Sequence, residues 1–146
     1  MSERTVIQSI TPRSLVSLLP NTNAYQAACV MTRANCGSVL ILEHSSELIG
    51  IVTERDLMTR VVAKGLDPKA TGVADIMTRG PICVAPETKV TDAVVIMIER
   101  GFRHLPIVNA ERKILGVFSV RDALPREVDN AAAIAEFHQQ VNDALG

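Results

Sequence analysis

The chain repeats itself at an offset of 66 residues. Residues 50–56 read Gly-Ile-Val-Thr-Glu-Arg-Asp, and residues 116–122 read Gly-Val-Phe-Ser-Val-Arg-Asp. The same offset pairs Ile10 with Ile76 and Met31 with Met97, without a gap between Ile10 and Asp122. One copy of about sixty residues buries little apolar surface by itself. The repeat therefore predicts two copies of one supersecondary unit that pack against each other.

Each copy is expected to form a strand, a helix, two strands and a second helix. In the first copy, Asn21 or Thr22 can cap a helix whose alanines and Met31 recur at helical spacing. Thr53 begins the second helix, with Leu57, Val61 and Val62 as its apolar face. The expected strands are 15–19, 39–42 and 48–52 in the first copy, and 82–84, 105–108 and 114–118 in the second.

The predicted fold class is α/β (α+β), with two β-α-β-β-α repeats packed sheet to sheet about a pseudo-twofold axis, plus a C-terminal helix. The expected boundaries are 4–66 for the first repeat, 70–125 for the second and 126–146 for the C-terminal amphipathic helix. Pro125 is expected to end the last helix of the second repeat early.

The C-terminal segment carries one apolar stripe at helical spacing, formed by Ile134, Phe137, Val141 and Ala144-Leu145. Two roles fit this pattern equally well. The stripe covers the core, or it forms a contact between subunits.

Composition excludes several classes of protein. A formal net charge of −1 argues against the basic surface of a typical nucleic-acid-binding protein. No apolar run reaches the length of a membrane span, and the first residues do not resemble a signal peptide. Cys29, Cys36 and Cys83 lack CxxC spacing, which indicates small core residues in a reducing, cytoplasmic compartment. The three histidines are scattered, so no metal site is expected.

Two turns carry hydroxyl and acidic side chains at the same spacing. Thr53 and Asp56 are three residues apart at a helix start, which is close to a capping box, and Ser119 and Asp122 repeat this arrangement. Arginines at 55 and 121 stand where backbone N–H groups already favour an anion. A capping role and a ligand-binding role are compatible, since a capping hydroxyl can still donate to a phosphate oxygen.

The second copy also places Arg103 and His104 directly before a buried strand. The first copy has Gly37 and Ser38 at the corresponding positions. A solvated loop end is the simplest interpretation of one such basic pair. However, strand pairing would bring this pair close to Arg121, which indicates a local cationic site.

These motifs together resemble a tandem pair of cystathionine β-synthase-type (CBS) domains, known as a Bateman module. The resemblance rests on residues 50–56 and 116–122, on Asp75-Ile76-Met77-Thr78 leading to Pro86, and on residues 103–108. It covers residues 4 to about 125. Each motif is weak by itself, whereas the paired set at a constant offset is specific.

The resemblance implies a regulatory module and not an enzyme. Such pairs bind adenosine compounds, namely AMP, ADP, ATP, NAD or S-adenosylmethionine, in two clefts between the repeats. It further implies that the Asp side chains hold the ribose hydroxyls, the hydroxyl residues meet ribose or phosphate oxygens, and the basic residues offset phosphate charge. The implied set for one cleft is Asp122, Ser119, Arg121, Arg103, His104, Cys36, Gly37, Ser38 and Val16. The implied set for the other cleft is Asp56, Thr53, Arg55, Thr78 and Ile82.

One departure from the family pattern concerns the Met-Thr pair at Met77-Thr78. At the 66-residue offset, Thr11-Pro12 stand in its place, which would leave the Asp122 cleft one hydroxyl short. No cofactor or metal is required, and the regulated protein is not identified by the sequence. A homodimer is expected through helix faces around Met31, Met97 and Ile134. The alternative function is a protein–protein interaction module without a physiological ligand.

Overall fold

The computed structural model describes residues 3–11 and 15–145. The chain forms two compact units: Ser14–Pro81, here called the Asp56 unit, and Met1–Arg13 with Ile82–Gly146, here called the Asp122 unit. These units do not follow the repeat boundaries of the sequence, because the N-terminal segment belongs with the second repeat. In the same way, the residues just after the first repeat complete the first unit.

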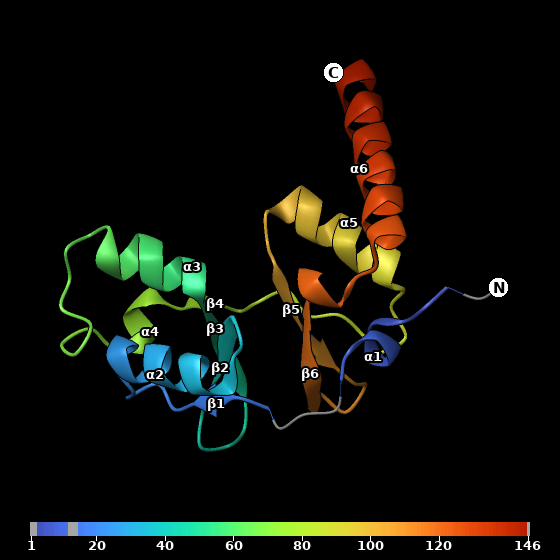
Figure 1. Cartoon of the computed structure of the whole chain (residues 1–146). Coiled ribbons are helices and arrows are strands. Elements are labelled where there is room, and N and C mark those ends of the chain that lie inside the picture. Colours follow the sequence, from blue (N-terminus) through green and yellow to red (C-terminus); the bar gives the residue numbers. More distant parts are fainter. Residues whose placement is uncertain (1–2, 12–14, 146) are drawn as a thin grey trace. The chain divides into compact units, whose positions relative to one another are not determined.

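The Asp56 unit contains a four-stranded sheet in the order β1-β2-β3-β4 (Figure 1). Strand β1 pairs parallel with β2, and the other two pairings are antiparallel. The strands are β1 (Ser17–Leu18), β2 (Ser38–Leu42), β3 (Leu48–Thr53) and β4 (Thr78–Arg79). The helices are α2 (Ala24–Ala34), α3 (Glu54–Leu57), which continues as a π-helical segment over Met58–Val62, and α4 (Val73–Ile76).

Helix α2 shows why these residues form a helix and which face they bury. Asn23 caps its N-terminus and forms a full capping box with Gln26, so the cap lies later than the expected Asn21 or Thr22. Ala24, Ala27 and Met31 are buried at helical spacing, as the pattern predicted. The helix joins a core of apolar side chains from the sheet, the π-helical segment and the region of α4, namely Val39, Ile41, Val52, Val61, Val73, Ile76 and Met77.

The Asp122 unit contains β5 (His104–Val108) and β6 (Ile114–Ser119) as an antiparallel pair, and Val84 adds a parallel bridge to Ile107. The predicted strand 82–84 is thus reduced to this bridge. The helices are α1 (Val6–Ser9), α5 (Val90–Arg100) and α6 (Pro125–Leu145), with a 3-10 turn at Val120–Asp122. Their core includes Val6, Val90, Ala93, Val94, Met97, Leu105, Ile107, Phe118 and Ala131.

The two repeats share details of their backbone conformation. Both hairpins are bulged at matching positions, between Ile41 and Leu42 and between Ile107 and Val108. Helices α2 and α5 end at matching left-handed residues, Asn35 at φ 52° and Gly101 at φ 75°. From β1 to the 3-10 turn, the offset of 66 residues is therefore confirmed in three dimensions.

Before β1 the structural offset is 67 residues, so the expectation that no gap is needed is wrong. The amide of Val6 donates to Thr88 O, and the amide of Val73 makes the same contact with Thr22 O. The side chain of Ile10 lies over Gly116 as Met77 lies over Gly50. One extra residue is thus inserted between Thr11 and Ser17 in the first copy.

Several expectations about burial are corrected. Met31 and Met97 are 5% and 4% exposed and belong to their own cores, so they offer no surface to a second subunit. Val62 is 74% exposed, because the π-helical segment turns it away from the core that Val61 enters. Cys83 is exposed and the other two cysteines are half-buried, so none is a fully buried core residue.

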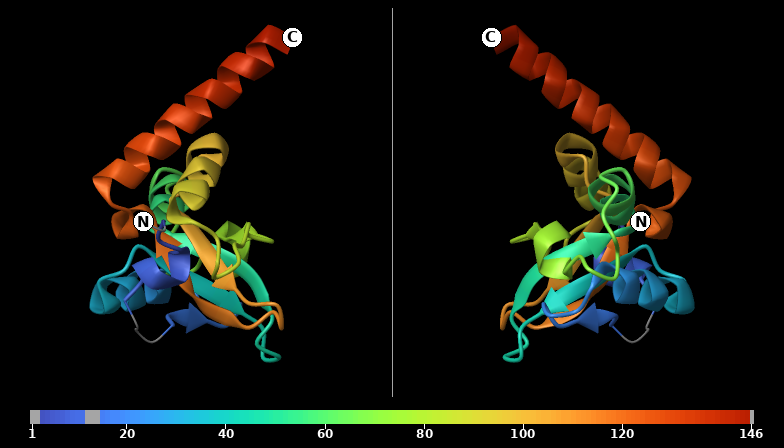
Figure 2. Two further views of the ribbon diagram at one scale, coloured as in Figure 1. Left: turned by 90° about the vertical axis from the view of Figure 1, so that its right-hand side faces the viewer. Right: turned by 90° about the vertical axis from the view of Figure 1, so that its left-hand side faces the viewer.

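Pro125 begins α6 and does not merely end the preceding element. Proline suits the first turn of a helix, because its missing N–H would have no partner there. Only Glu127 and Ala131 of α6 are buried. The helix packs against α5 near its start and then extends past it (Figures 1 and 2). The apolar stripe of Ile134, Phe137, Val141 and Leu145 is exposed, which excludes the core role in this unit.

Candidate functional site

The turn from β3 into α3 forms a capping box. Thr53 has an extended backbone, and its hydroxyl oxygen accepts a 3.2 Å hydrogen bond from the amide of Asp56. One carboxylate oxygen of Asp56 accepts a 2.9 Å bond from the amide of Thr53. The capping role inferred from the sequence is therefore present. It holds the Asp56 side chain, which is 11% exposed, in one orientation.

The turn after β6 repeats this geometry in the Asp122 unit. The amide of Ser119 donates to Asp122 Oδ2 at 2.8 Å, and the Ser119 hydroxyl accepts from the amide of Arg121 at 3.3 Å. Each aspartate thus uses one carboxylate oxygen for the cap. The second oxygen of each carboxylate remains for another donor, and a carboxylate oxygen pair suits a vicinal diol.

The two aspartates differ in their ionic neighbours. Arg60 Nε lies 3.7 Å from Asp56 Oδ1, one helical turn along the chain. The same guanidinium donates from Nη1 to the carbonyls of Ile76 at 2.9 Å and Met77 at 3.3 Å. Among residues 3–11 and 15–145, the Asp122 carboxylate forms no ion pair within 4.0 Å. Arg4 instead donates to the backbone carbonyl of Asp122 at 3.0 Å.

Strand pairing sets the neighbours of each hydroxyl residue. Ser38 lies opposite Thr53, and the carbonyl of Gly37 accepts a 3.0 Å bond from the amide of Glu54. In the Asp122 unit, His104 lies opposite Ser119. There the carbonyl of Arg103 accepts a 3.3 Å bond from the amide of Val120.

The structure therefore brings Arg103 and His104 beside the Ser119–Asp122 turn, as strand pairing predicted. Arg103 and Arg121 are exposed, and His104 is half-buried. Arg55 is the exposed arginine at the equivalent turn of the Asp56 unit. The Asp122 unit thus has the larger cationic group at this position.

Thr78 lies in the Asp56 unit, where it pairs with Ile51 of β3. Because the offset before β1 is 67, the residue that corresponds to Thr78 is Thr11 and not Pro12, which lies outside the described residues. Thr11 is exposed and directly follows Ile10, which contacts Gly116 of β6. The missing hydroxyl was therefore inferred from the wrong register, and Thr11 is the hydroxyl residue at the corresponding position.

The remaining predicted residues fall into both units. Cys36, Gly37, Ser38 and Val16 lie in the Asp56 unit; the Cys36 thiol donates to Ser38 O, and Val16 O accepts from the amide of Leu40. Ile82 packs against the core of the Asp122 unit. The expected combinations of Cys36–Ser38 and Val16 with Asp122, and of Ile82 with Asp56, would join residues of two units and stay predictions.

The sequence did not reveal three charged residues beside these turns: Arg60, Arg4 and Glu127. Arg60 could have been found, because it stands four residues after Asp56, the spacing at which charges meet on a helix. Arg4 and Glu127 form an ion pair across 123 positions, and no local pattern indicates such a contact.

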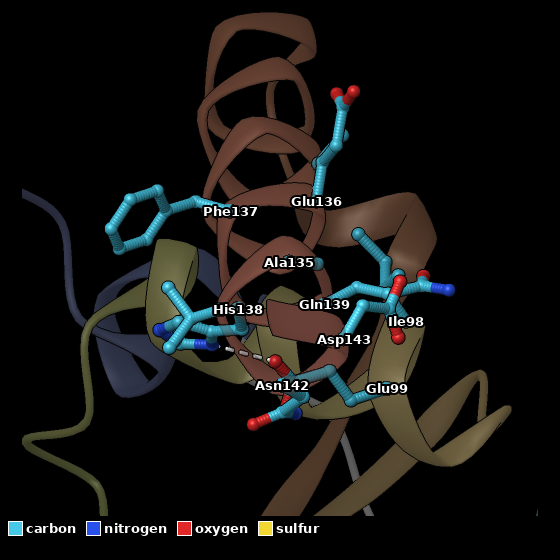
Figure 3. Close-up of a pocket in the computed structure, with 11 residues that line it drawn as sticks. Ile98, Glu99, Ala135, Glu136, Phe137, His138, Gln139, Asn142 and Asp143 are labelled. Carbon is cyan, nitrogen blue, oxygen red and sulfur yellow. Dashed lines mark hydrogen bonds and ion pairs between the residues drawn. The ribbon is translucent and has the colours of Figure 1, made fainter. Parts of the chain in front are cut away.

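A groove of about 930 Å³ lies between α5 and α6 (Figure 3). Ile98, Phe137 and Val141 line it together with acidic residues, and Glu99 contacts His138 Nδ1 at 2.7 Å. It contains none of the predicted site residues.

Within the described part of the chain, no three His, Cys, Asp or Glu side chains are grouped so that they could hold a metal ion. Residues 3–11 and 15–145 also contain no helix with the length and apolar character needed to cross a membrane.

Comparison with known proteins explains the repeated turns. The family model of the CBS domain matches residues 7–63 and again residues 73–128. The chain belongs to the CBS domain family. It is 33% identical to the uncharacterized protein MK0525 of Methanopyrus kandleri, over 95% of this chain and 71% of that protein. It spans only 18% of a 36% identical relative, the meiotically up-regulated gene 70 protein of Schizosaccharomyces pombe.

Solved structures of CBS domain proteins share the fold. A putative signal-transduction protein with CBS domains from Burkholderia ambifaria is 30% identical, with a TM-score of 0.75 over 83% of this chain and 90% of that chain. The CBS domain protein PAE2072 from Pyrobaculum aerophilum, solved in complex with AMP, gives a TM-score of 0.78 at 24% identity, over 89% and 99% of the two chains. The mixed α/β fold is thus that of a CBS domain pair with a C-terminal helix.

Proposed function

We propose that this CBS domain pair is a regulatory module that binds an adenosine-containing ligand at its two Asp-bearing turns. The observation that carries the proposal is the duplicated cap. In each unit, a backbone amide holds one carboxylate oxygen and leaves the other to accept from a ribose hydroxyl. The AMP complex of the similarly folded PAE2072 supports an adenosine compound as the ligand class.

The proposed roles follow from the chemistry of each side chain. Asp122 accepts from the ribose diol, and the Ser119 hydroxyl meets a ribose or phosphate oxygen. Arg103, Arg121 and His104 offset phosphate charge through charge-assisted hydrogen bonds. We propose the same roles for Asp56, Thr53 and Arg55, with Thr78 and Ile82 beside them. Cys36–Ser38 and Val16 complete the Asp122 site.

The two sites should differ in the charge of the ligand that they prefer. Arg103 and His104 lie beside the Asp122 turn in addition to Arg121. At the corresponding positions the Asp56 turn has Gly37 and Ser38 with Arg55. We therefore assign the more anionic nucleotide, ADP or ATP, to the Asp122 site.

Calorimetric titration with AMP, ADP, ATP, NAD and S-adenosylmethionine tests the proposal. Binding should weaken strongly in Asp56→Ala or Asp122→Ala, each at its own site. It should be unchanged in Asp143→Ala, a matched control at an exposed position of α6. If the wild-type protein binds none of these compounds, the proposed ligand class is wrong.

The alternative function, an interaction module without a ligand, has one observation in its favour. The stripe of Ile134, Phe137, Val141 and Leu145 is exposed along α6. We propose that this stripe forms the homodimer contact, with the regulated protein still to be identified. We also propose a reducing, cytoplasmic compartment and no catalytic step.

A further inference from the structure

Arg4, from the N-terminal segment, binds both the backbone of the Asp122 turn and the side chain of Glu127. Arg4 Nε donates to Glu127 Oε2 at 3.2 Å, and Arg4 Nη2 donates to Glu127 Oε1 at 2.7 Å. The same Nη2 donates to the backbone carbonyl of Asp122 at 3.0 Å. One guanidinium therefore joins three parts of the Asp122 unit: the segment before α1, the turn after β6 and the first turn of α6.

Glu127 fixes the start of α6 from the same position. It is the third residue of the helix, and its Oε1 accepts a 2.7 Å bond from the amide of Leu124. This contact is the carboxylate half of a capping box. The Glu127 side chain is 8% exposed and the Arg4 side chain 31%. A glutamate with so little exposed surface is stabilised as an anion by the guanidinium of Arg4 and by the Leu124 amide.

The pKa values of both groups agree with this geometry. The hydrogen bond from Arg4 is the main cause that holds the pKa of Glu127 below its ordinary value. The same bond raises the pKa of Arg4, and the nearby Asp122 charge adds to the effect. The pair is therefore ionised at neutral pH, and the Arg4 charge also interacts with the charge of Asp122.

The Asp56 unit shows why the Asp122 turn needs such a restraint. After Thr53 the chain continues as α3 and the π-helical segment, so helical hydrogen bonds hold the backbone of Asp56. After Ser119 the chain forms only the 3-10 turn Val120–Asp122 and then leaves it in an extended conformation at Ala123. No helix continues directly from this turn to hold the backbone of Asp122. The hydrogen bond from Arg4 to Asp122 O restrains it instead, from a segment distant in the sequence.

We propose that Arg4 and Glu127 are positioning residues for the Asp122 site and couple ligand binding there to the first turn of α6. This inference rests on the proposed function, because it assigns Asp122 to the ribose. Neither side chain needs to touch the ligand. By linkage, a ligand that favours the restrained aspartate must also stabilise the start of α6.

The test compares ADP with 2′-deoxy-ADP, because only ADP offers both ribose hydroxyls to Asp122. The wild-type protein should prefer ADP by roughly tenfold, the size of one hydrogen bond to a charged group. In Arg4→Met this preference should fall below about threefold, while binding of the deoxy analogue changes little. A merely structural role for Arg4 would weaken both ligands equally and leave the preference intact.

Glu3→Gln is the matched control, because it removes the exposed 3.1 Å ion pair with Lys89 directly beside Arg4. It should leave the preference unchanged. Arg4→Lys keeps the charge but not the bidentate geometry, so an intermediate preference is expected, and it replaces Arg4→Met if that variant does not fold. A wild-type preference that depends on Asp122 but survives both Arg4 variants would overturn the positioning role alone. Absence of ADP binding in the wild type would overturn this inference, and absence of binding to all five adenosine compounds would overturn the proposed function as well.

Discussion

Ile10 lies against Gly116 so closely that a Cβ atom on the glycine would fall 2.5 Å from Ile10 Cδ1. Met77 and Gly50 form the same contact in the other unit, where a Cβ would fall 2.4 Å from Met77 Sδ. In both units a large side chain that follows a short helix, α1 or α4, thus covers a glycine in the sheet. This contact defines the register before β1, and with it the place of Thr11 and Thr78.

Alanine at these glycines should therefore destabilise the protein, and Gly50→Ala should cost more than Gly116→Ala. The Cβ at Gly50 would also meet Met77 Cγ at 2.8 Å and Thr78 O at 3.1 Å, and a backbone oxygen cannot move aside. Overpacking of this kind costs about 1–3 kcal/mol of unfolding free energy. Urea denaturation measures the difference.

The contact at Gly116 offers a matched rescue. Ile10→Val removes the Cδ1 atom that the new Cβ would meet. The double variant Ile10→Val/Gly116→Ala should therefore lose less unfolding free energy than the two single variants lose in total. Gly72→Ala is the control, because its Cβ would meet nothing closer than 3.6 Å. Strictly additive free energies would mean that Ile10 does not contact Gly116.

The Arg4–Glu127 pair predicts a pH dependence of stability. Folding lowers the pKa of Glu127 from its ordinary value of 4.5, so the folded protein binds this proton more weakly than the unfolded chain. The stabilisation is therefore present above pH 4.5 and is lost as the pH falls through the lower folded pKa. Glu127→Gln should lose about 1–2 kcal/mol at neutral pH, a value reduced by the partial exposure of Arg4.

Thermal melts of wild type and Glu127→Gln from pH 7 to pH 3 check this. The difference in Tm should be largest at neutral pH and should shrink below about pH 4.5. A difference that stays constant over this range would show that the carboxylate charge does not stabilise the fold.

Arg103 should discriminate between ligands by their phosphate charge. Loss of one charge-assisted contact weakens binding by roughly tenfold, so Arg103→Ala should lower affinity for ATP and ADP far more than for adenosine. Asp122→Ala should weaken all three alike, because all three carry the ribose diol. Isothermal titration calorimetry measures both. If Asp56→Ala abolishes ATP binding while Asp122→Ala preserves it, the two sites have been assigned in the wrong order.

The exposed stripe of α6 should control the oligomeric state. Phe137 is 62% exposed, so Phe137→Glu should convert the proposed dimer to a monomer with little change in the stability of each unit. Gln139→Glu adds the same charge on another face of the helix and should leave the dimer intact. Light scattering at micromolar concentration reports the mass. A wild-type monomer, or a dimer that tolerates Phe137→Glu, would contradict this contact.

Local patterns predicted much of the fold correctly. The spacing of Ala24, Ala27 and Met31 predicted the buried face of α2, since a helix buries residues at intervals of three and four. The Thr53–Asp56 spacing predicted a cap, because capping depends on residues within one turn. Pro125 was misread because proline both interrupts a helix and suits its first turn, and local sequence does not distinguish the two roles.

The identity of Ile10 and Ile76 concealed the correct alignment of the two repeats before β1. Ile10 and Ile76 match at the 66-residue offset, yet Ile10 has the structural place of Met77. The backbone hydrogen bonds of Val6 and Val73 reveal the inserted residue. Such bonds depend on the positions of the two segments in space and not on the identity of their side chains.

The duplication, the family and the two Asp-bearing turns can be read from the sequence alone, because each depends on short motifs of neighbouring residues. Which segments complete each unit, and where α6 leaves its stripe exposed, depend on tertiary packing. Tertiary packing also brings Arg4 to Glu127, 123 positions away, and to the backbone carbonyl of Asp122. Contacts of this kind arise from packing, since burial brings together charges that no local pattern relates.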